Sequence, residues 1–386
     1  FRILKIMYQF SAKSKRVLTV LTVFSLVAFL LVEHYKTDHK RNWYDQKLEA
    51  SQLAKKSFDY LKNYRLQKGV FIDAINDPNE TAMIGQDITP ITTDRGYIEA
   101  KLTALNPNFS AVIVEMLNEA GVNQGDNVAV AFTGSIPGLN ICVISALQTL
   151  KLNPIIITSV GSSNWGANDP DFTWLDMERI LVDAGIFKFK SIAASIGGGL
   201  DRGRGLSPEG RDLIYSAITR NNILFINEEY LDKSIEKRMD IYREHSDNKP
   251  IETFINVGGG IASLGSVENS QFIPSGLIES LPMKNYPSAG VLIKMADKKI
   301  PVIHLLNITQ LAEKYGLPVS PKPIPQPGSG DVFVKKQYNV LLTIIVTSVL
   351  FVLIITVFVL EQKRHKLGTE QVEIFKHSKT NDIGEI

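Results

Sequence analysis

Residues 126–158 read DNVAVAFTGSIPGLNICVISALQTLKLNPIIIT, and this stretch decides the fold. It opens with an apolar run at 127–132, passes through a loop of small residues, and closes with a second apolar run at 154–158. Short, continuous apolar runs are typical of strands that are buried on both faces of a sheet. Residues 139–150, between the two runs, form a helix candidate. A strand, a helix and a second strand in this order predict a parallel pair joined by a helical crossover.

The same alternation continues downstream to residue 317. Further strand candidates are residues 190–194, 222–226, 253–257 and 301–304. Helix candidates are residues 174–184, 208–220, 228–245 and 308–315, with a helical pair at 97–105 and 109–120 ahead of the first strand. We therefore predict one α/β domain with a Rossmann-like, mostly parallel sheet and helices on both faces.

Two uncharged apolar runs, residues 17–32 and 339–360, lie near the ends of the chain. A helix needs about 20 residues to cross the hydrocarbon core of a bilayer, so both runs are predicted to be transmembrane helices. A cleaved signal peptide is the alternative for the first run. That run lacks a small-x-small cleavage site, because Glu33, His34 and Tyr35 follow it at once. An uncleaved anchor is therefore expected.

The flanking charges predict the orientation of these two spans. Residues 1–16 contain five basic residues and no acidic one, and Lys363, Arg364 and Lys366 follow the second span. The positive-inside rule then places both termini in the cytoplasm and the main domain outside the cell membrane. The expected order is a cytoplasmic N-terminus at 1–16, a span at 17–32, a helical stalk and loop at 33–94, the α/β domain at 95–317, a proline-rich linker at 318–338, a span at 339–360 and a cytoplasmic tail at 361–386.

The connecting segments have their own sequence patterns. Apolar residues recur at helical spacing over residues 42–66 without Gly or Pro, which predicts a helix that extends the first span as a stalk. Five prolines between residues 318 and 327 favour a stiff polyproline II spacer, which would hold the domain off the membrane. The polar tail after Lys366 is expected to be disordered.

The composition narrows the class of protein. The chain has 386 residues, with 42 Lys and Arg against 40 Asp and Glu, so its charge does not indicate a nucleic-acid partner. Hydrophobic residues make up 44%, which excludes wholesale disorder. The single cysteine, Cys142, excludes an intramolecular disulfide and any zinc site built from several cysteines. We predict no metal site and no cofactor.

Three loops of small residues, at 133–140, 197–205 and 258–265, each follow a predicted strand. The carboxyl ends of parallel strands meet at one edge of a sheet, where ligands bind, and free N–H groups in such loops attract anions. The predicted ligand-binding residues are Thr133, Gly134, Ser135, Gly138, Asn140, Gly198, Gly199, Arg202, Arg204, Gly258, Gly259 and Gly260. One interpretation of Arg202, Arg204 and Arg211 is a clamp for carboxylates. The alternative is a solvated surface of mixed charge, because Asp201, Glu209 and Asp212 are interleaved with them. None of the loops is a nucleotide fingerprint, and tight turns with close packing remain the alternative for each.

Ser135 is a weak candidate for a catalytic nucleophile, because it lies between a strand and a helix. The surrounding sequence is not G-x-S-x-G, and a triad would need His245 or His304, the only histidines in the core region. Ser135 as the N-cap of the following helix is the alternative. The sequence therefore contains no complete catalytic constellation, and whether the protein is an enzyme stays open.

A second candidate region contains Asp169, Asp171 and Asp176, near Trp165 and Trp174. Carboxylates beside tryptophans can bind a divalent cation or a sugar. The alternative is a loop in which one aspartate caps a helix.

The segments A-F-T-G-S-x-P-G-x-N at 131–140 and N-V-G-G-G-I-A-S-L-G at 256–265 occur together with two spans and a proline-rich stalk. In this layout the chain resembles the poly-gamma-glutamate system protein family. The resemblance implies a bacterial membrane protein that works with a poly-γ-glutamate ligase and its polytopic membrane partner. It implies a pathway rather than a reaction, and it assigns no catalytic residue.

These features lead to three hypotheses. The first is a non-enzymatic accessory protein of poly-γ-glutamate synthesis or export, with polyglutamate as a ligand of the loops. The second is an envelope hydrolase or transpeptidase that uses Ser135. The third is an extracellular sensor whose α/β domain binds a small molecule.

Overall fold

The structure is a computed structural model that describes residues 15–381. Within the predicted cytoplasmic segments, residues 1–14 and 382–386 lie outside the described part of the chain. The chain divides into two compact units. One is Lys40–Val334, here called the α/β unit, and the other combines the two ends of the chain, here called the terminal unit.

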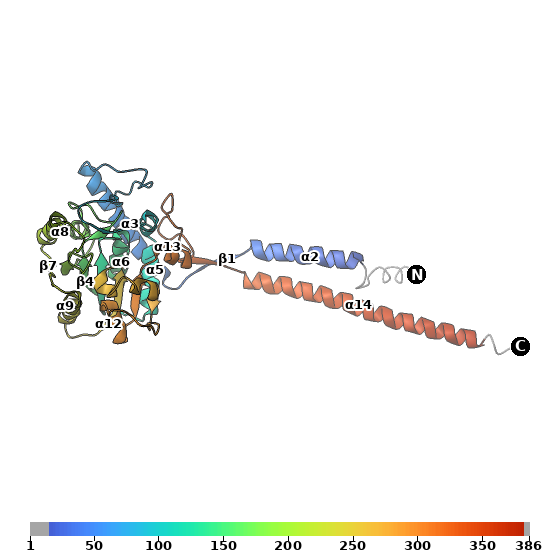
Figure 1. The fold of residues 1–386 in the computed structure, drawn as a ribbon. Coiled ribbons are helices and arrows are strands. Elements are labelled where there is room, and N and C mark those ends of the chain that lie inside the picture. The colour runs from blue at the N-terminus through green and yellow to red at the C-terminus, as the bar shows by residue number, and fades with distance from the viewer. Residues whose placement is uncertain (1–14, 382–386) are drawn as a thin grey trace. The chain divides into compact units, whose positions relative to one another are not determined.

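The α/β unit is built on a seven-stranded sheet with the order β7-β6-β4-β3-β8-β10-β9 (Figure 1). The strands are β3 (Asn127–Thr133), β4 (Asn153–Ser159), β6 (Ala193–Ser195), β7 (Leu224–Phe225), β8 (Ile251–Val257), β9 (Gly276–Ile278) and β10 (Val302–Leu305). Six of these strands are parallel, and β9 pairs antiparallel with β10 at one edge. The predicted mostly parallel sheet is confirmed, whereas the sequence analysis did not predict β9.

The strands are apolar on both faces because both faces are covered. In β3, Val130 and Phe132 face one hydrophobic core, and Ala129 and Ala131 face the other. The first core is covered by α3 (Tyr44–Gln67), α4 (Ile98–Ala104), α5 (Phe109–Glu119), α6 (Pro137–Thr149), α7 (Trp174–Asp183) and α13 (Ile308–Lys314). The second is covered by α9 (Leu231–Glu244), α10 (Ile261–Leu264) and α12 (Val291–Asp297).

Smaller elements complete the unit. Helix α8 (Pro208–Arg220) packs with α7 over a third cluster of buried residues. Short strands β2 (Thr92–Asp94) and β5 (Ser162–Ser163) pair in parallel near the carboxyl end of β4, and α11 (Asn269–Phe272) follows α10. The order of the strands places a switch point between β3 and β8, because the chain runs outward from β3 to β7 and then returns to β8.

Helix α3 is part of the α/β unit, which corrects the prediction of a stalk. Ala50, Ala54 and Leu61 on one face of this helix are completely buried. They pack against α5 and α6, so the helix covers the domain instead of extending a membrane span. The sequence pattern predicted a helix but could not show what its apolar face would bury.

The proline-rich segment also packs on the α/β unit, where a free spacer was expected. The side chain of Asn108 donates a hydrogen bond of 3.0 Å to the carbonyl of Gln326, and the side chain of Asn79 donates one of 2.8 Å to the carbonyl of Pro321. Val332 and Phe333 are completely buried at the end of the segment. Backbone carbonyls freed by the prolines therefore find side-chain donors on the unit itself.

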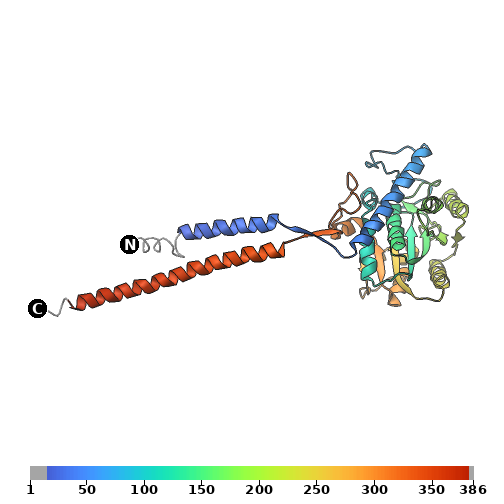
Figure 2. The ribbon, with the colours of Figure 1, turned by 180° about the vertical axis from the view of Figure 1, so that it is seen from behind.

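The terminal unit contains two long apolar helices, α2 (Lys15–His34) and α14 (Val340–Asn381), which pack along one another (Figure 2). Lys15–His34 and Val340–Lys363 are long and apolar enough to cross a membrane, and nearly all of their side chains are exposed. Strands β1 (Thr37–Lys40) and β11 (Val334–Gln337) pair with each other next to these helices. Helix α14 continues to Asn381, where the sequence predicted a disordered tail after Lys366.

Candidate functional site

The three predicted loops lie at the carboxyl edge of the sheet, after β3, β6 and β8. They also approach one another closely. A Cβ atom on Gly258 would lie 2.6 Å from Oγ1 of Thr133, and one on Gly197 would lie 3.1 Å from Cβ of Ser159. Glycine is therefore required where the loops after β6 and β8 cross the ends of β4 and β3.

Several of the predicted binding residues serve the packing of the fold. A Cβ on Gly138 would lie 2.5 Å from the carbonyl oxygen of Ala104, so this glycine lets α6 approach the end of α4. Asn140 is completely buried and donates a hydrogen bond of 2.9 Å to the carbonyl of Thr133. A Cβ on Gly134 would clash with the carbonyl oxygen of Val160, so this glycine also permits a close approach of two backbone segments. These contacts leave the outer part of the loops as the region open to a ligand.

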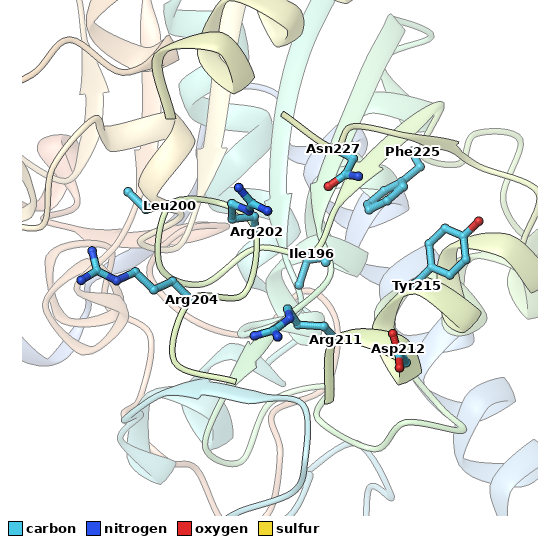
Figure 3. Close-up of a pocket in the computed structure, with 9 residues that line it drawn as sticks. All are labelled: Ile196, Leu200, Arg202, Arg204, Arg211, Asp212, Tyr215, Phe225 and Asn227. Carbon is cyan, nitrogen blue, oxygen red and sulfur yellow. The ribbon is translucent and has the colours of Figure 1, made fainter. Parts of the chain in front are cut away.

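The loop after β6 borders a cavity of about 740 Å³ at this edge of the sheet. Figure 3 shows side chains from this loop, from α8 and from the end of β7, with Arg204 and Leu200 extending away from the others. The lining residues are Ile196, Leu200, Arg202, Arg204, Arg211, Asp212, Tyr215, Phe225 and Asn227. The structure thus brings together the three arginines that the sequence predicted as a carboxylate clamp, and we call this group the arginine pocket.

The arginines of this pocket keep most of their hydrogen-bond donors free. Arg211 donates one hydrogen bond of 2.7 Å to the carbonyl of Leu206, and Arg202 donates one of 3.2 Å to the carbonyl of Glu229. Within residues 15–381, none of the three arginines forms an ion pair with a carboxylate. With Asp212 as the one acidic lining residue, the pocket has a positive formal charge.

A buried network holds the loop that carries Arg202 and Arg204. Asp201 and Leu200 have φ angles of 60° and 56°, and the Asp201 side chain is buried whereas Leu200 and Arg202 on either side of it are exposed. The Asp201 carboxylate accepts hydrogen bonds of 2.7 Å from Ser195 and 2.6 Å from Ser234. Arg238 of α9 pairs with the same carboxylate at 2.9 Å, and both charged side chains are at most 2% exposed.

Ser135 does not cap α6, because Ile136 occupies the N-cap position. Its Oγ instead accepts a hydrogen bond of 3.0 Å from the backbone N–H of Ser163. Its carbonyl accepts one of 2.6 Å from the Nζ atom of Lys101, and the same Nζ lies 2.8 Å from Oγ of Ser163. Burial lowers the pKa of Lys101 to about 8. The sequence analysis did not predict Lys101 or Ser163.

In the aspartate region, Asp169 and Asp176 each pair with an arginine. Asp176 closes a capping box with Thr173 at the start of α7 and pairs with Arg220. Asp169 pairs with Arg65 at 3.2 Å, and Trp174 is completely buried in the first core. Residues 15–381 contain no group of three or more His, Cys, Asp or Glu side chains that could hold a metal ion.

The two core histidines lie apart from Ser135. His304 is buried in β10, and its Nδ1 lies 2.9 Å from the side-chain amide of Asn256. His245 follows α9, and its ring contacts the carbonyl of Ile241. Neither histidine contacts Ser135 through these hydrogen bonds, so they give no Ser-His pair at Ser135.

No protein-family model, curated protein or solved structure matches the chain.

Proposed function

We propose that this protein is a membrane-anchored accessory protein of poly-γ-glutamate synthesis or export, and that its Rossmann-like α/β unit binds carboxylates of the polymer in the arginine pocket. The observation that carries the proposal is the cavity lined by Arg202, Arg204 and Arg211, none of which pairs with a carboxylate within residues 15–381. Each guanidinium offers a planar set of donors that matches a carboxylate in a two-pronged hydrogen bond. A polymer with one free carboxylate per residue supplies such groups at regular intervals.

The exposure of the pocket favours a weak and transient grip. Arg202 and Arg204 are exposed at the rim, and exposed ion pairs contribute little each and are screened by salt. Several such contacts along one polymer add up, because each bound carboxylate keeps its neighbours close to the surface. An export or assembly factor needs weak and reversible contacts of this kind, because the polymer has to be released and passed along.

The position of the protein in this proposal follows from the terminal unit. Helix α2 and the first part of α14 would cross the cell membrane, with both termini in the cytoplasm and the α/β unit outside. A poly-γ-glutamate ligase and a polytopic membrane protein are the proposed partners. Deletion of the gene should then reduce the amount of polymer at the cell surface while the ligase remains present.

The binding test uses the full chain in detergent and fluorescently labelled poly-γ-glutamate. We expect saturable binding that weakens with salt, and a loss of at least about tenfold when Arg202, Arg204 and Arg211 are all replaced by Ala. Arg243→Ala is the matched control, because Arg243 is an exposed arginine outside the pocket. Equal affinity of the triple variant and the wild type would refute the arginine pocket as the binding site.

The same assay separates a polymer binder from a sensor. Free glutamate at the same concentration of carboxylate should compete poorly, because it cannot make several contacts at once. Tight, salt-resistant binding of free glutamate would instead support a sensor of small molecules.

A further inference from the structure

Lys101 is a buried lysine without an acidic partner. It is 6% exposed, and within the described residues its ammonium contacts only the carbonyl of Ser135 and the hydroxyl of Ser163. The other buried lysine, Lys47, pairs with Glu115 at 2.6 Å. A buried charge without a counter-charge is costly, so burial lowers the pKa of Lys101 to about 8, and the neutral amine becomes the main form only above that pH. Asp94 and Glu99 are the acidic residues on the neighbouring segments, and burial is the cause that lowers the pKa of Lys101.

The contact with Ser163 lies where chemistry in α/β folds usually takes place. Ser163 belongs to β5, directly beyond the carboxyl end of β4, and Ser135 follows β3 at the same edge. Gly96 and Asn164, the neighbours of Ser163 in space and in sequence, line a separate cavity of about 670 Å³. This cavity also contains Arg95 and the exposed ring of Tyr97. It is distinct from the arginine pocket.

We propose that Ser163 and Lys101 form a Ser-Lys catalytic pair that cleaves an ester or amide bound in this cavity. In the 2.8 Å contact Nζ donates to Oγ, and after Lys101 loses a proton the same geometry lets the neutral amine accept the proton of the hydroxyl, as nucleophilic catalysis requires. A lysine with a lowered pKa can take up the proton near neutral pH, whereas an ordinary lysine cannot. This activity does not depend on the proposed binding of polymer.

The chemical step balances with water as the only co-reactant. Neutral Lys101 takes the proton from Oγ of Ser163 as Oγ bonds to the carbonyl carbon of the substrate. The protonated lysine then gives this proton to the leaving amine or alcohol as the bond between carbon and leaving group breaks. Water hydrolyses the acyl-serine ester with the same amine as base, which releases the acid and restores the serine.

Residues 94–97 lie next to the hydroxyl of Ser163 and control access to it. A Cβ on Gly96 would lie 2.7 Å from Oγ of Ser163, and Gly96 lines the cavity whereas Ser163 does not. Two hydrogen bonds of 3.1 Å hold this segment, from the N–H of Asn164 to the carbonyl of Asp94 and from the N–H of Gly96 to the side chain of Asn164. Residues 94, 95 and 97 are exposed, and Asp94 at the end of β2 pairs with Ser163 of β5, so displacement of the segment breaks this end of the pairing. Residues 94–97 are displaced in this way when substrate binds.

The test uses a fluorophosphonate probe, which phosphonylates activated serines, on the full chain in native membranes. We expect an adduct that peptide mapping locates on Ser163, with a rate that increases about tenfold between pH 7 and pH 9 as Lys101 loses its proton. Ser163→Ala should abolish the adduct. Lys101→Arg keeps a charged donor but removes the base, so it should reduce the rate at least about a hundredfold.

Two controls separate catalysis from damage to the fold. Lys47→Met removes the other buried lysine and should leave the labelling rate within about threefold if the unit stays folded. Variants of the arginine pocket should also label normally, so the failure of one proposal does not imply failure of the other. The absence of an adduct on Ser163 at pH 9, an adduct on Ser135 instead, or normal labelling of Lys101→Arg would each overturn the Ser-Lys pair.

Discussion

Asp201 is a buried residue that holds the loop of the exposed arginine pocket in place. Its carboxylate accepts hydrogen bonds from the hydroxyls of Ser195 and Ser234 and pairs with the guanidinium of Arg238. The next residue, Arg202, is exposed. Replacing Asp201 by Ala leaves the Arg238 charge buried without a partner. The free energy of unfolding should therefore fall by about 3–5 kcal/mol.

The measurement is urea unfolding of the full chain in detergent, followed by tryptophan fluorescence. Asp240→Ala is the control, because Asp240 pairs with the exposed Arg243 and its loss should have little effect. A similar unfolding midpoint for Asp201→Ala and the wild type would contradict the anchoring role of Asp201.

Glu178 gives the stability of the protein a pH dependence. Burial raises the pKa of this fully buried carboxyl from 4.5 to about 7, although Ser191 donates two hydrogen bonds to it. The folded state therefore holds the proton more tightly than the unfolded state. This contribution to stability is complete below about pH 4.5 and is lost as the pH rises through about 7.

In Glu178→Gln this pH dependence should disappear, so the difference in stability between variant and wild type should change steadily between pH 5 and pH 7.5. The difference between the two proteins is the useful quantity, because His304 acts in the opposite direction. Burial lowers the pKa of His304 to about 4, so its contribution is lost as the pH falls below about 6.5. Parallel stability curves for the two proteins would show that Glu178 does not titrate in this range.

Lys101 and Ser163 show why part of the site was not visible in the sequence. The two residues are 62 positions apart, and Lys101 lies in a helical pattern where a lysine is normally exposed. Helix α4 follows β2, which pairs with β5, and it packs against α6 and α13, so the contact depends on partners far away in the sequence. Arg202, Arg204 and Arg211 were predictable because the loop and the start of α8 already place them close together along the chain.

At the scale of the elements, the strands of the parallel sheet were predictable because both of their faces are apolar. The boundaries of β3 and β8 lie within two residues of the prediction. Edge strand β9 has only three residues and pairs antiparallel, so it lacks the pattern of a buried strand. Helix α3 and the proline-rich segment were recognised locally but misplaced, since their partners lie far away in the sequence.

The packing of α3 leads to a prediction for this helix. Leu61 is completely buried, whereas Leu66 on the same helix is 46% exposed. Leu61→Ala should lower the free energy of unfolding by about 2–5 kcal/mol, because it removes buried methyl groups and leaves a cavity. Leu66→Ala should cost much less. Equal and small effects in urea unfolding would indicate that α3 is the detached stalk that the sequence suggested.

At the scale of the whole molecule, the decisive question is which side of the membrane holds the α/β unit. The single cysteine makes this measurable. Cys142 is completely buried and burial raises the pKa of its thiol to about 12, so it should not react with a maleimide. The wild type therefore provides a silent background for cysteines introduced at exposed positions.

Met283 is fully exposed on the α/β unit, and Lys366 is exposed beyond the apolar part of α14. In intact cells, a membrane-impermeant maleimide should label Met283→Cys, and it should label Lys366→Cys only after the membrane is broken. This result would place both proposed sites outside the cell, where an exported polymer passes. The reverse pattern would place the α/β unit in the cytoplasm, and the arginine pocket would then meet the polymer before export, at the ligase.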